Sequence, residues 1–219
     1  NIATIKNFLK KGDVYQINYT NPKYYNIHGN PFNFFINVCK AENPYYGYYI
    51  NTGNHQVLSF SPERFFKVSN RKIESHPMKG TANRSNNPIE DNNYKNQLSL
   101  STKDRAEHLM IVDLMRNDLG KICDYNSIHV KNLFNILSFE TVHQMVSEVH
   151  GLLRPEIVER DVIQALFPGG SITGAPKERA MQIIDEIELY PRECYTGSIG
   201  YGLSNGDMDF NIAIRTMTQ

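Results

Sequence analysis

The sequence predicts an α+β fold built mainly on antiparallel strands, and two observations lead to this class. Alternating segments rich in aromatic and β-branched residues follow one another over residues 45–75 and recur at 142–152. Asn205-Gly206 lies between two further alternating segments and is a strong short-range signal for a hairpin. Helical segments stand singly between these runs, whereas a doubly wound parallel sheet would place a helix after each strand.

The first hundred residues are expected to begin with a helix and then to consist mostly of strands. Apolar residues at helical spacing begin at Ile2, and Gly12 marks the end of that helix. Pro31 suits the first turn of a second, short helix. In order, the expected elements are a helix over 2–9, a strand over 14–20, a helix over 31–38, three or four antiparallel strands over 45–75, and a polar surface loop or the start of a helix over 85–96.

The rest of the chain is expected to alternate between longer helices and strand pairs. Gly120 is read as the stop of the longest helix, and Pro176 lies near the first turn of another. In order, the expected elements are a helix over 104–119, strands over 127–130 and 142–152, a helix over 161–166, a glycine-dense turn over 168–175, a helix over 176–188, and strands over 195–204 and 207–216. No internal repeat or linker divides the chain, so residues 1–219 are expected to form one domain.

Composition narrows the functional classes. Lys plus Arg and Asp plus Glu both number 23, which disfavours nucleic acid as the main partner. No apolar run is long enough for a membrane span. The three cysteines are widely spaced and form no CxxC pair, which is typical of reduced thiols in an intracellular protein. A cytoplasmic location is expected; organellar targeting stays open, because the chain does not begin with Met.

Four charged residues lie at positions where a charged side chain either suits a functional site or needs a partner to be tolerated. Glu63 follows Ser61-Pro62 at the start of a strand, and Lys79 occupies a tight turn between a proline and a glycine. Glu107 is on the longest predicted helix, and Arg215 is on an apolar final strand, where an unpaired arginine is expensive.

Each of these four also has a structural interpretation. Glu63 fits a capping role, Glu107 a solvated helix charge, Lys79 a solvent-facing side chain and Arg215 a structural ion pair. The glycine-dense turn lacks the spacing of a phosphate-binding loop. The residues alone therefore support an α+β enzyme-like domain with an anion site.

Eight segments together resemble the chorismate-utilising enzymes, a family that includes anthranilate, aminodeoxychorismate, isochorismate and salicylate synthases. They occur in family order and at family spacing over nearly the whole chain. The segments are GDVYQIN (12–18), SPERF (61–65), PMKGTANR (77–84), EHLMIVDLMRNDLG (107–120), FETVHQMVSEVHG (139–151), FPGGSITGAPKERAMQIIDEIE (167–188), PRECYTGSIGY (191–201) and FNIAIRT (210–216).

The resemblance implies a fold, a substrate and a metal. It implies two antiparallel sheets packed face to face with helices outside, and chorismate bound between the layers with one Mg²⁺. It further implies that residues 1–219 are a chorismate-binding catalytic domain truncated at both ends, with a second magnesium glutamate beyond Gln219.

The resemblance also assigns roles to individual residues. Arg215 is expected to bind the enolpyruvyl carboxylate as a bidentate fork, with Tyr195 beside it. Glu107 is expected to be a magnesium ligand, and Glu63 the general acid that protonates the departing 4-hydroxyl, which requires a raised pKa. The remaining expected substrate contacts are Gly80, Thr81, Ser171 and Ile172 around the ring carboxylate and metal, and His143 near the ring hydroxyl.

Two positions discriminate among members of the family. Members that add water at C2 carry a lysine base where this chain has Gln16, which cannot abstract a proton. Lys79 lies in PMKGT, where the anthranilate- and isochorismate-forming members usually have alanine. A neutral amine there is expected to attack C2 as hydroxide leaves C4.

The expected activity is therefore conversion of chorismate and ammonia to 4-amino-4-deoxychorismate, on the route to para-aminobenzoate and folate. A glutamine amidotransferase subunit or domain is the expected partner and source of ammonia. The alternatives are the anthranilate-forming reaction of tryptophan biosynthesis and a non-catalytic remnant that binds chorismate.

Overall fold

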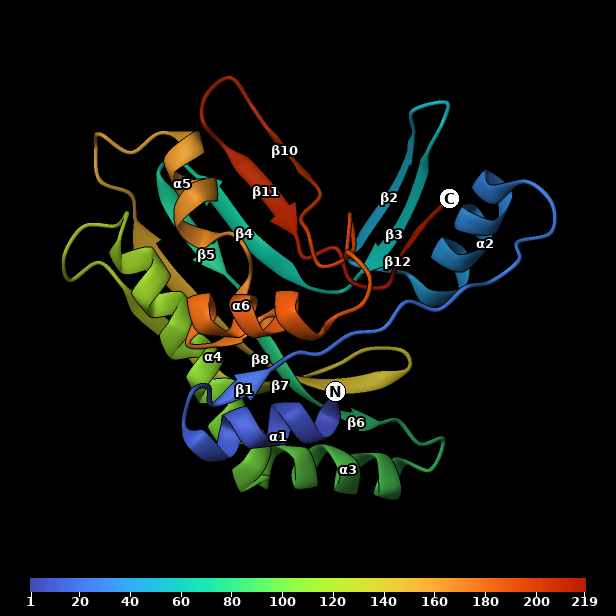
Figure 1. Cartoon of the computed structure of the whole chain (residues 1–219), viewed down its shortest axis with the longest axis horizontal. Helices are drawn as coiled ribbons and strands as arrows, with labels where there is room; N and C mark the ends of the chain where they lie inside the picture. Colours follow the sequence, from blue (N-terminus) through green and yellow to red (C-terminus); the bar gives the residue numbers. More distant parts are fainter.

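The computed structural model describes residues 1–219 and confirms an α+β fold with antiparallel sheets (Figure 1). The helices are α1 (Ile2–Lys11), α2 (Pro31–Glu42), α3 (Pro88–Leu100), α4 (Thr102–Gly120), α5 (Glu159–Leu166) and α6 (Lys177–Ile187), with a 3₁₀ turn η1 (Gly170–Ile172). The strands are β1 (Gln16–Ile17), β2 (Tyr46–Asn51), β3 (Gln56–Ser61), β4 (Arg64–Ser69), β5 (Lys72–Ser75), β6 (Met78–Asn83), β7 (His129–Ser138), β8 (Val142–Leu152), β9 (Gly174–Ala175), β10 (Gly200–Gly202), β11 (Met208–Asn211) and β12 (Thr216–Thr218).

The strands form three sheets of unequal size. The largest has seven strands in the order β10-β11-β4-β5-β8-β6, with β7 also paired to β8. A second sheet has the order β12-β3-β2, and β1 pairs with β9 alone. In Figure 1 the β12-β3-β2 sheet rises on the right and strands β10, β11, β4 and β5 rise on the left, so the two sheets diverge from a common base.

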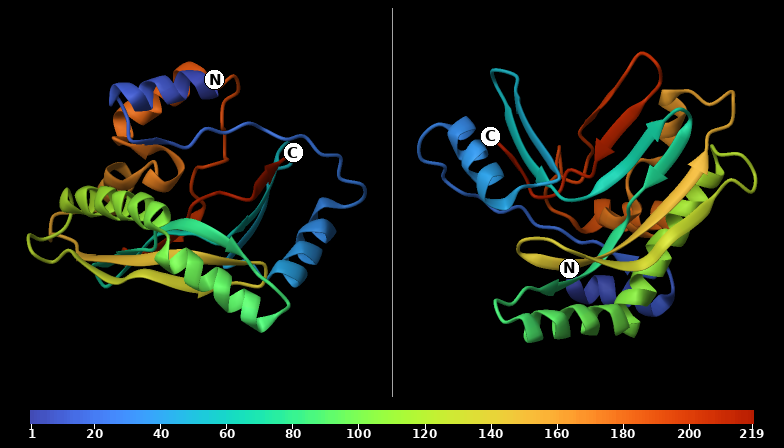
Figure 2. Two further views of the ribbon diagram at one scale, coloured as in Figure 1. Left: turned by 90° about the horizontal axis from the view of Figure 1, so that it is seen from below. Right: turned by 180° about the vertical axis from the view of Figure 1, so that it is seen from behind.

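The main hydrophobic core lies between the large sheet and the helices on one of its faces. Figure 2 shows α3 and α4 along that face. Residues 111, 112, 115 and 119 of α4 are buried at helical spacing, which forms a single apolar stripe. The last three of these share the main core cluster with Phe65 and Phe66 of β4 and Ile73 of β5, each at most 2% exposed. Because the sheet is covered here, α4 has a fixed position relative to β4 and β6.

The N-terminal segment packs against α6. Val14, Ala180 and Ile183 form a small buried cluster, and Phe8 and Ile17 pack against it. Asn1 adds a hydrogen bond from Nδ2 to the carbonyl oxygen of Ile187 (2.9 Å). The N-terminal helix and β1 are thus held against α6, which is far from them in sequence. No helix is both long and apolar enough to cross a lipid bilayer.

Several predicted elements are confirmed closely, among them the helices at 2–9 and 104–119, the strand at 142–152 and the hairpin through Asn205-Gly206. The polar stretch at 85–96 is mostly helix: the Asn87 side chain accepts a hydrogen bond from the amide of Ile89 (3.0 Å), and Pro88 occupies the first turn. The expected strand at 14–20 shrinks to two residues, since only β9 pairs with it.

The predicted final strand at 207–216 is wrong in its second half. β11 ends at Asn211, and Arg215 has a left-handed backbone (φ 51°) between β11 and β12. The reason is a change of partner: β11 pairs with β4 in the large sheet, whereas β12 pairs with β3 in the smaller one. Residues 212–215 carry the chain from one sheet to the other, so Arg215 is not on a strand.

Gly174→Ala should destabilise the fold, because Gly174 permits the β1–β9 pairing. Its φ is 147°, and an added Cβ would lie 2.1 Å from the backbone oxygen of Gln16. We expect the free energy of unfolding in urea to fall by about 2–4 kcal/mol. Gly202→Ala is the control, because its Cβ would meet only Met208 Cγ at 3.6 Å. Equal stability of the two variants would contradict this account.

Candidate functional site

A buried carboxyl group forms the centre of the candidate site. Glu63, in the connection between β3 and β4, is only 5% exposed. The Ser171 hydroxyl donates a hydrogen bond to its Oε1 (2.8 Å). Lys79 of β6 reaches the same turn, with Nζ 3.4 Å from the carbonyl oxygen of Ser171. Three residues expected in the site, separated by up to 108 positions, are therefore brought together by η1.

Local backbone features place these side chains. Gly80 has a left-handed backbone (φ 85°), and the register of β6 against β8 shifts between Met78 and Thr81. An added Cβ at Gly80 would approach Asp104 and Leu98 at 3.2 Å, so glycine allows α3 and α4 to pack closely on this strand. The lysine is thus held on an irregular strand that two helices cover.

Burial moves the two ionisable groups toward their neutral forms. Burial raises the pKa of Glu63 to about 7, although the Ser171 hydroxyl and the nearby Lys79 oppose it. Burial likewise lowers the pKa of Lys79, against the attraction of Glu63 and Glu107. Near neutral pH this environment supports a proton-bearing carboxyl group beside an amine with a weakened hold on its proton.

Glu107 lies on α4 on the side of Lys79 and fits a simple magnesium site. Its side chain is 40% exposed, and its only ion pair is a long one to Lys103 (3.9 Å). No cluster of three His, Cys, Asp or Glu side chains has the geometry of a metal site. Mg²⁺ commonly takes one or two carboxylates and keeps several waters or substrate oxygens. The accessible, weakly paired carboxylate of Glu107 meets that requirement for one protein ligand.

A large cavity adjoins the Glu63 segment. Its volume is about 1240 Å³, and Pro62, next to Glu63, forms part of its wall. Tyr195 and Arg215 line it as well. No ion pair or side-chain hydrogen bond involves Arg215, so the structural ion pair considered for it is absent. The exposed guanidinium remains available for an anion.

His143 is oriented away from this cavity. Its Nδ1 is 2.9 Å from Ser138 Oγ, and its Nε2 is 3.0 Å from Asp91 Oδ1 on α3. Alternation along β8 turns the next residue, Gln144, into the cavity. The Oε1 atom of Gln144 is buried without a hydrogen-bond partner. Gln144 is therefore a candidate substrate contact that the sequence reasoning missed, although period-2 alternation over 142–152 already separates it from His143.

The other expected residues are distributed around the site. Gln16 lies on β1 opposite Ala175, and its Oε1 is buried without a partner. Thr81 is exposed on β6 and pairs with Gln144 in register. Ile172 contributes its side chain to the core, so only its backbone faces the neighbouring segments. The structure thus groups Glu63, Lys79 and Ser171 directly, whereas of the other expected residues only Tyr195 and Arg215 line the cavity.

Glu63→Gln should make the protein more stable at high pH. The folded-state pKa of Glu63 is about 7, above the ordinary 4.5, so the unfolded chain releases this proton first as pH rises. The wild-type protein is therefore destabilised relative to Glu63→Gln only above pH 4.5. This difference in the free energy of unfolding grows up to pH 7 and then stays constant at about 3 kcal/mol. Urea unfolding of both proteins from pH 4 to 8 measures it. Glu178→Gln, at an exposed position, is the control, and a pH-independent difference for Glu63→Gln would contradict the raised pKa.

Comparison with known proteins agrees with this arrangement. The family model described as chorismate binding enzyme matches residues 1–219. Aminodeoxychorismate synthase component 1 of Escherichia coli K12 is 42% identical over 98% of this chain and 47% of its own length. The chloroplastic aminodeoxychorismate synthase of Arabidopsis thaliana is 41% identical over 99% of this chain and 24% of its own.

A solved structure supports the same family. Anthranilate synthase component I of Streptococcus pneumoniae TIGR4 superposes with a TM-score of 0.87 at 34% identity, covering 99% of this chain and 48% of that protein. The chain thus spans about half the length of the bacterial proteins it matches, or less than that for the plant protein. On the match over its whole length, this chain belongs to the family of chorismate-binding enzymes.

Proposed function

We propose that this chain carries the active site for converting chorismate and ammonia to 4-amino-4-deoxychorismate. The observation that carries the proposal is the half-buried Lys79 amine near the buried Glu63 carboxyl: the pKa of Lys79 is lowered and that of Glu63 is raised. The two relatives named aminodeoxychorismate synthase, each about 40% identical, support it. Because the chain spans only part of those proteins, the activity of the whole protein is part of the proposal.

The substrate's carboxylates select its orientation. Arg215 has free donors in the cavity and suits the enolpyruvyl carboxylate, with Tyr195 beside it. Gln144 offers an unpartnered amide oxygen to a hydroxyl or ammonia N–H. The backbone at Gly80 and Ile172, with Thr81, lies toward the ring carboxylate. His143 is hydrogen-bonded to Asp91 of α3, so it is not proposed as a contact to the substrate ring.

In the first step, the neutral Lys79 amine attacks C2 of chorismate. Both conjugated double bonds of the ring shift, and the C4–O bond breaks. Glu63 gives its proton to the departing hydroxide, which leaves as water, and Glu63 becomes a carboxylate. The nearby carboxylate then favours the positive charge that forms on the alkylated Lys79 nitrogen.

In the second step, ammonia attacks C4 and the bond between C2 and Lys79 breaks as the double bond shifts back. The enolpyruvyl group stays attached, so no pyruvate is released. The new ammonium group on C4 gives one proton to the Glu63 carboxylate, which regenerates the acid for the next turnover. Gln16 fits this outcome because an amide does not activate water for attack at C2.

Mg²⁺ is proposed as the cofactor, with Glu107 as its ligand from this chain. The metal would supply positive charge that stabilises a substrate carboxylate. A glutamine amidotransferase is proposed as the source of ammonia, because the bacterial relative is named as component 1 of its enzyme. A cytoplasmic location is proposed on the intracellular character of the cysteine pattern.

Anthranilate formation is the second candidate, because the solved relative at 34% identity is an anthranilate synthase component I. Lys79 is the residue that argues against it. A non-catalytic chorismate-binding remnant is disfavoured, since the structure retains the buried acid, the desolvated amine and a free arginine together.

The complete protein, incubated with chorismate, ammonia and Mg²⁺, should form 4-amino-4-deoxychorismate without pyruvate. Mass spectrometry and NMR of the product identify it. Anthranilate with one equivalent of pyruvate would instead assign the second function.

Lys79→Arg should lose at least a hundredfold in kcat, because it keeps the charge and removes the nucleophile. Wild-type protein given chorismate without ammonia should carry an adduct on Lys79, seen by intact mass. Arg179→Lys, on the surface of α6, is the control and should keep full activity. If Lys79→Arg turns over at the wild-type rate and no adduct forms, Lys79 only neutralises substrate charge.

Glu107→Gln should raise the Mg²⁺ concentration needed for half-maximal activity by at least tenfold while leaving thermal stability nearly unchanged. The reason is that the side chain is partly exposed and weakly paired, so it contributes little to folding. Asp113→Asn, an exposed carboxylate on the same helix, is the control. An unchanged magnesium requirement would remove Glu107 from the ligand set.

A further inference from the structure

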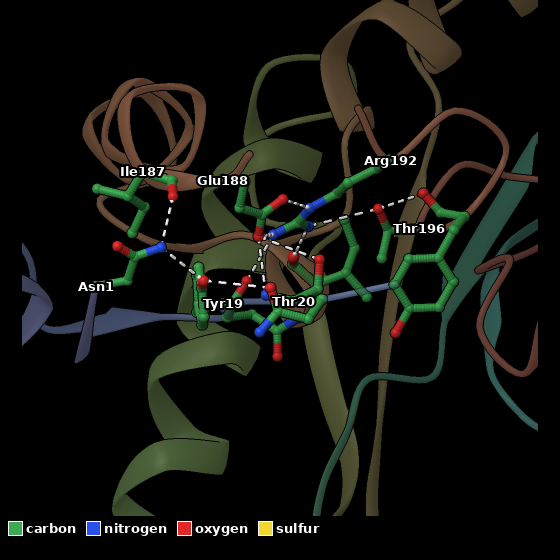
Figure 3. Close-up of polar contacts among 11 residues, drawn as sticks. Asn1, Tyr19, Thr20, Ile187, Glu188, Arg192 and Thr196 are labelled. Carbon is green, nitrogen blue, oxygen red and sulfur yellow. Dashed lines mark hydrogen bonds and ion pairs between the residues drawn. The ribbon is translucent and has the colours of Figure 1, made fainter. Parts of the chain in front are cut away.

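Arg192 forms part of the wall of the cavity that Tyr195 and Arg215 also line, and its guanidinium uses every donor it has. The guanidinium of Arg192 donates to Glu188 through Nε and one terminal nitrogen (2.8 and 2.7 Å). Its other three N–H groups reach the carbonyl oxygens of Ile172 (2.7 Å) and Asn18 (2.6 Å) and the hydroxyl of Thr196 (3.4 Å). Figure 3 shows this network around Arg192 and Glu188. Arginine has five N–H donors, so none is left for a substrate.

The acceptors belong to three segments that each carry a candidate site residue. Asn18 follows Gln16 by two positions, and Ile172 is bonded to Ser171. Thr196 follows Tyr195, and its hydroxyl also donates to the Tyr195 carbonyl oxygen (2.5 Å). One side chain therefore holds three otherwise separate segments of the site in register.

Glu188 anchors the arginine from the end of α6. Its side chain is 6% exposed, and that of Arg192 is 15% exposed. Glu188 also accepts hydrogen bonds from the amide and hydroxyl of Thr20 (2.8 and 3.1 Å). Burial opposes the charge on Glu188, but the hydrogen bonds from Arg192 and Thr20 outweigh it and lower its pKa. The pair is therefore ionised and geometrically fixed.

We propose that Arg192 is a positioning residue for the active site, acting through the Ile172 carbonyl on Ser171 and through Thr196 on Tyr195. Held in this way, Ser171 points its hydroxyl at Glu63 and its carbonyl at Lys79. Lysine at this position cannot replace it, because an ammonium has three donors and no planar fork to span these acceptors. The inference rests on the proposed roles of Glu63 and Tyr195.

The test compares Arg192→Lys, Ser171→Ala and the double variant in the complete protein. The pKa of Glu63 is followed by NMR of ¹³C-labelled glutamate carboxyls, with the signal assigned by its loss in Glu63→Gln. This readout needs no turnover, so it is separate from the proposed activity. Ser171→Ala should raise that pKa by about one unit, since it removes a hydrogen bond to a charged group.

Arg192→Lys should raise the pKa of Glu63 in the same direction, and the double variant should show no further rise beyond Ser171→Ala. Arg192→Lys should also raise the KM for chorismate at least fivefold, because Tyr195 would no longer be held in position. Arg179→Lys is again the matched control, because that arginine contacts Glu186, Gln182 and the Phe8 ring and none of the three site segments. If Arg192→Lys does not fold, Glu188→Gln, which keeps one acceptor oxygen, should show a smaller shift of the same sign.

Two results would overturn the inference. A lower melting temperature for Arg192→Lys with the wild-type Glu63 pKa and KM would make Arg192 purely structural. A raised KM with an unchanged Glu63 pKa would make it a substrate anchor. Failure of the wild-type protein to form 4-amino-4-deoxychorismate, with the pKa coupling intact, would count against the proposed function alone.

Discussion

Burial of the Glu63 carboxyl is the constraint on which the candidate site depends. The residue lies where the chain passes from the smaller sheet into the larger one, and the same crossing recurs in residues 212–215. The amide of Ile212 donates to the carbonyl oxygen of Glu63 (3.1 Å), and the hydroxyl of Ser61 donates to the Ile212 carbonyl oxygen (2.6 Å). These contacts fix the backbone on both sides of the acid while η1 covers its side chain. Removing water from a carboxyl is costly, and here that cost sets the acid's proton affinity.

The same arrangement explains how one small region serves two opposite electrostatic needs. The acid and amine lie on the covered side, where a low dielectric weakens both charges. Arg215 and Tyr195 line the cavity, and the Arg215 side chain is exposed there. The proposed dianionic substrate can thus be attracted by a charged group and react beside groups whose charged forms are disfavoured. Pro62, which precedes Glu63, and Gln144 are both in the wall of this cavity.

Much of the fold was predictable from local patterns, because periodicity and turn residues act over short distances. The strand at 142–152 and the helix at 104–119 are examples. The break before Arg215 was not predictable, since it comes from a change of pairing partner between two sheets. The same limit applied to the site. Glu63 and Lys79 could be singled out by residue type and motif, but the orientation of His143 and Gln144 depends on which face of β8 the helix α3 covers. The role of Arg192 was invisible, because its acceptors are mostly backbone carbonyls distant in sequence.

The Arg192 network also has a consequence for how the chain acquires its shape. Asn18 and Arg192 are separated by 174 positions, and β4 finds its neighbour β11 only in the last twelve residues. Contacts of such long range form late in folding, because the entropy cost of closing a large loop comes before the stabilisation from the contact. During synthesis from the N-terminus, Glu63 must therefore emerge well before Ser171, which covers it, and wait in water as an ordinary ionised glutamate. The acid gains its unusual proton affinity only after Ser171 has been made and has packed over it, so a polypeptide that stops before η1 lacks this chemistry.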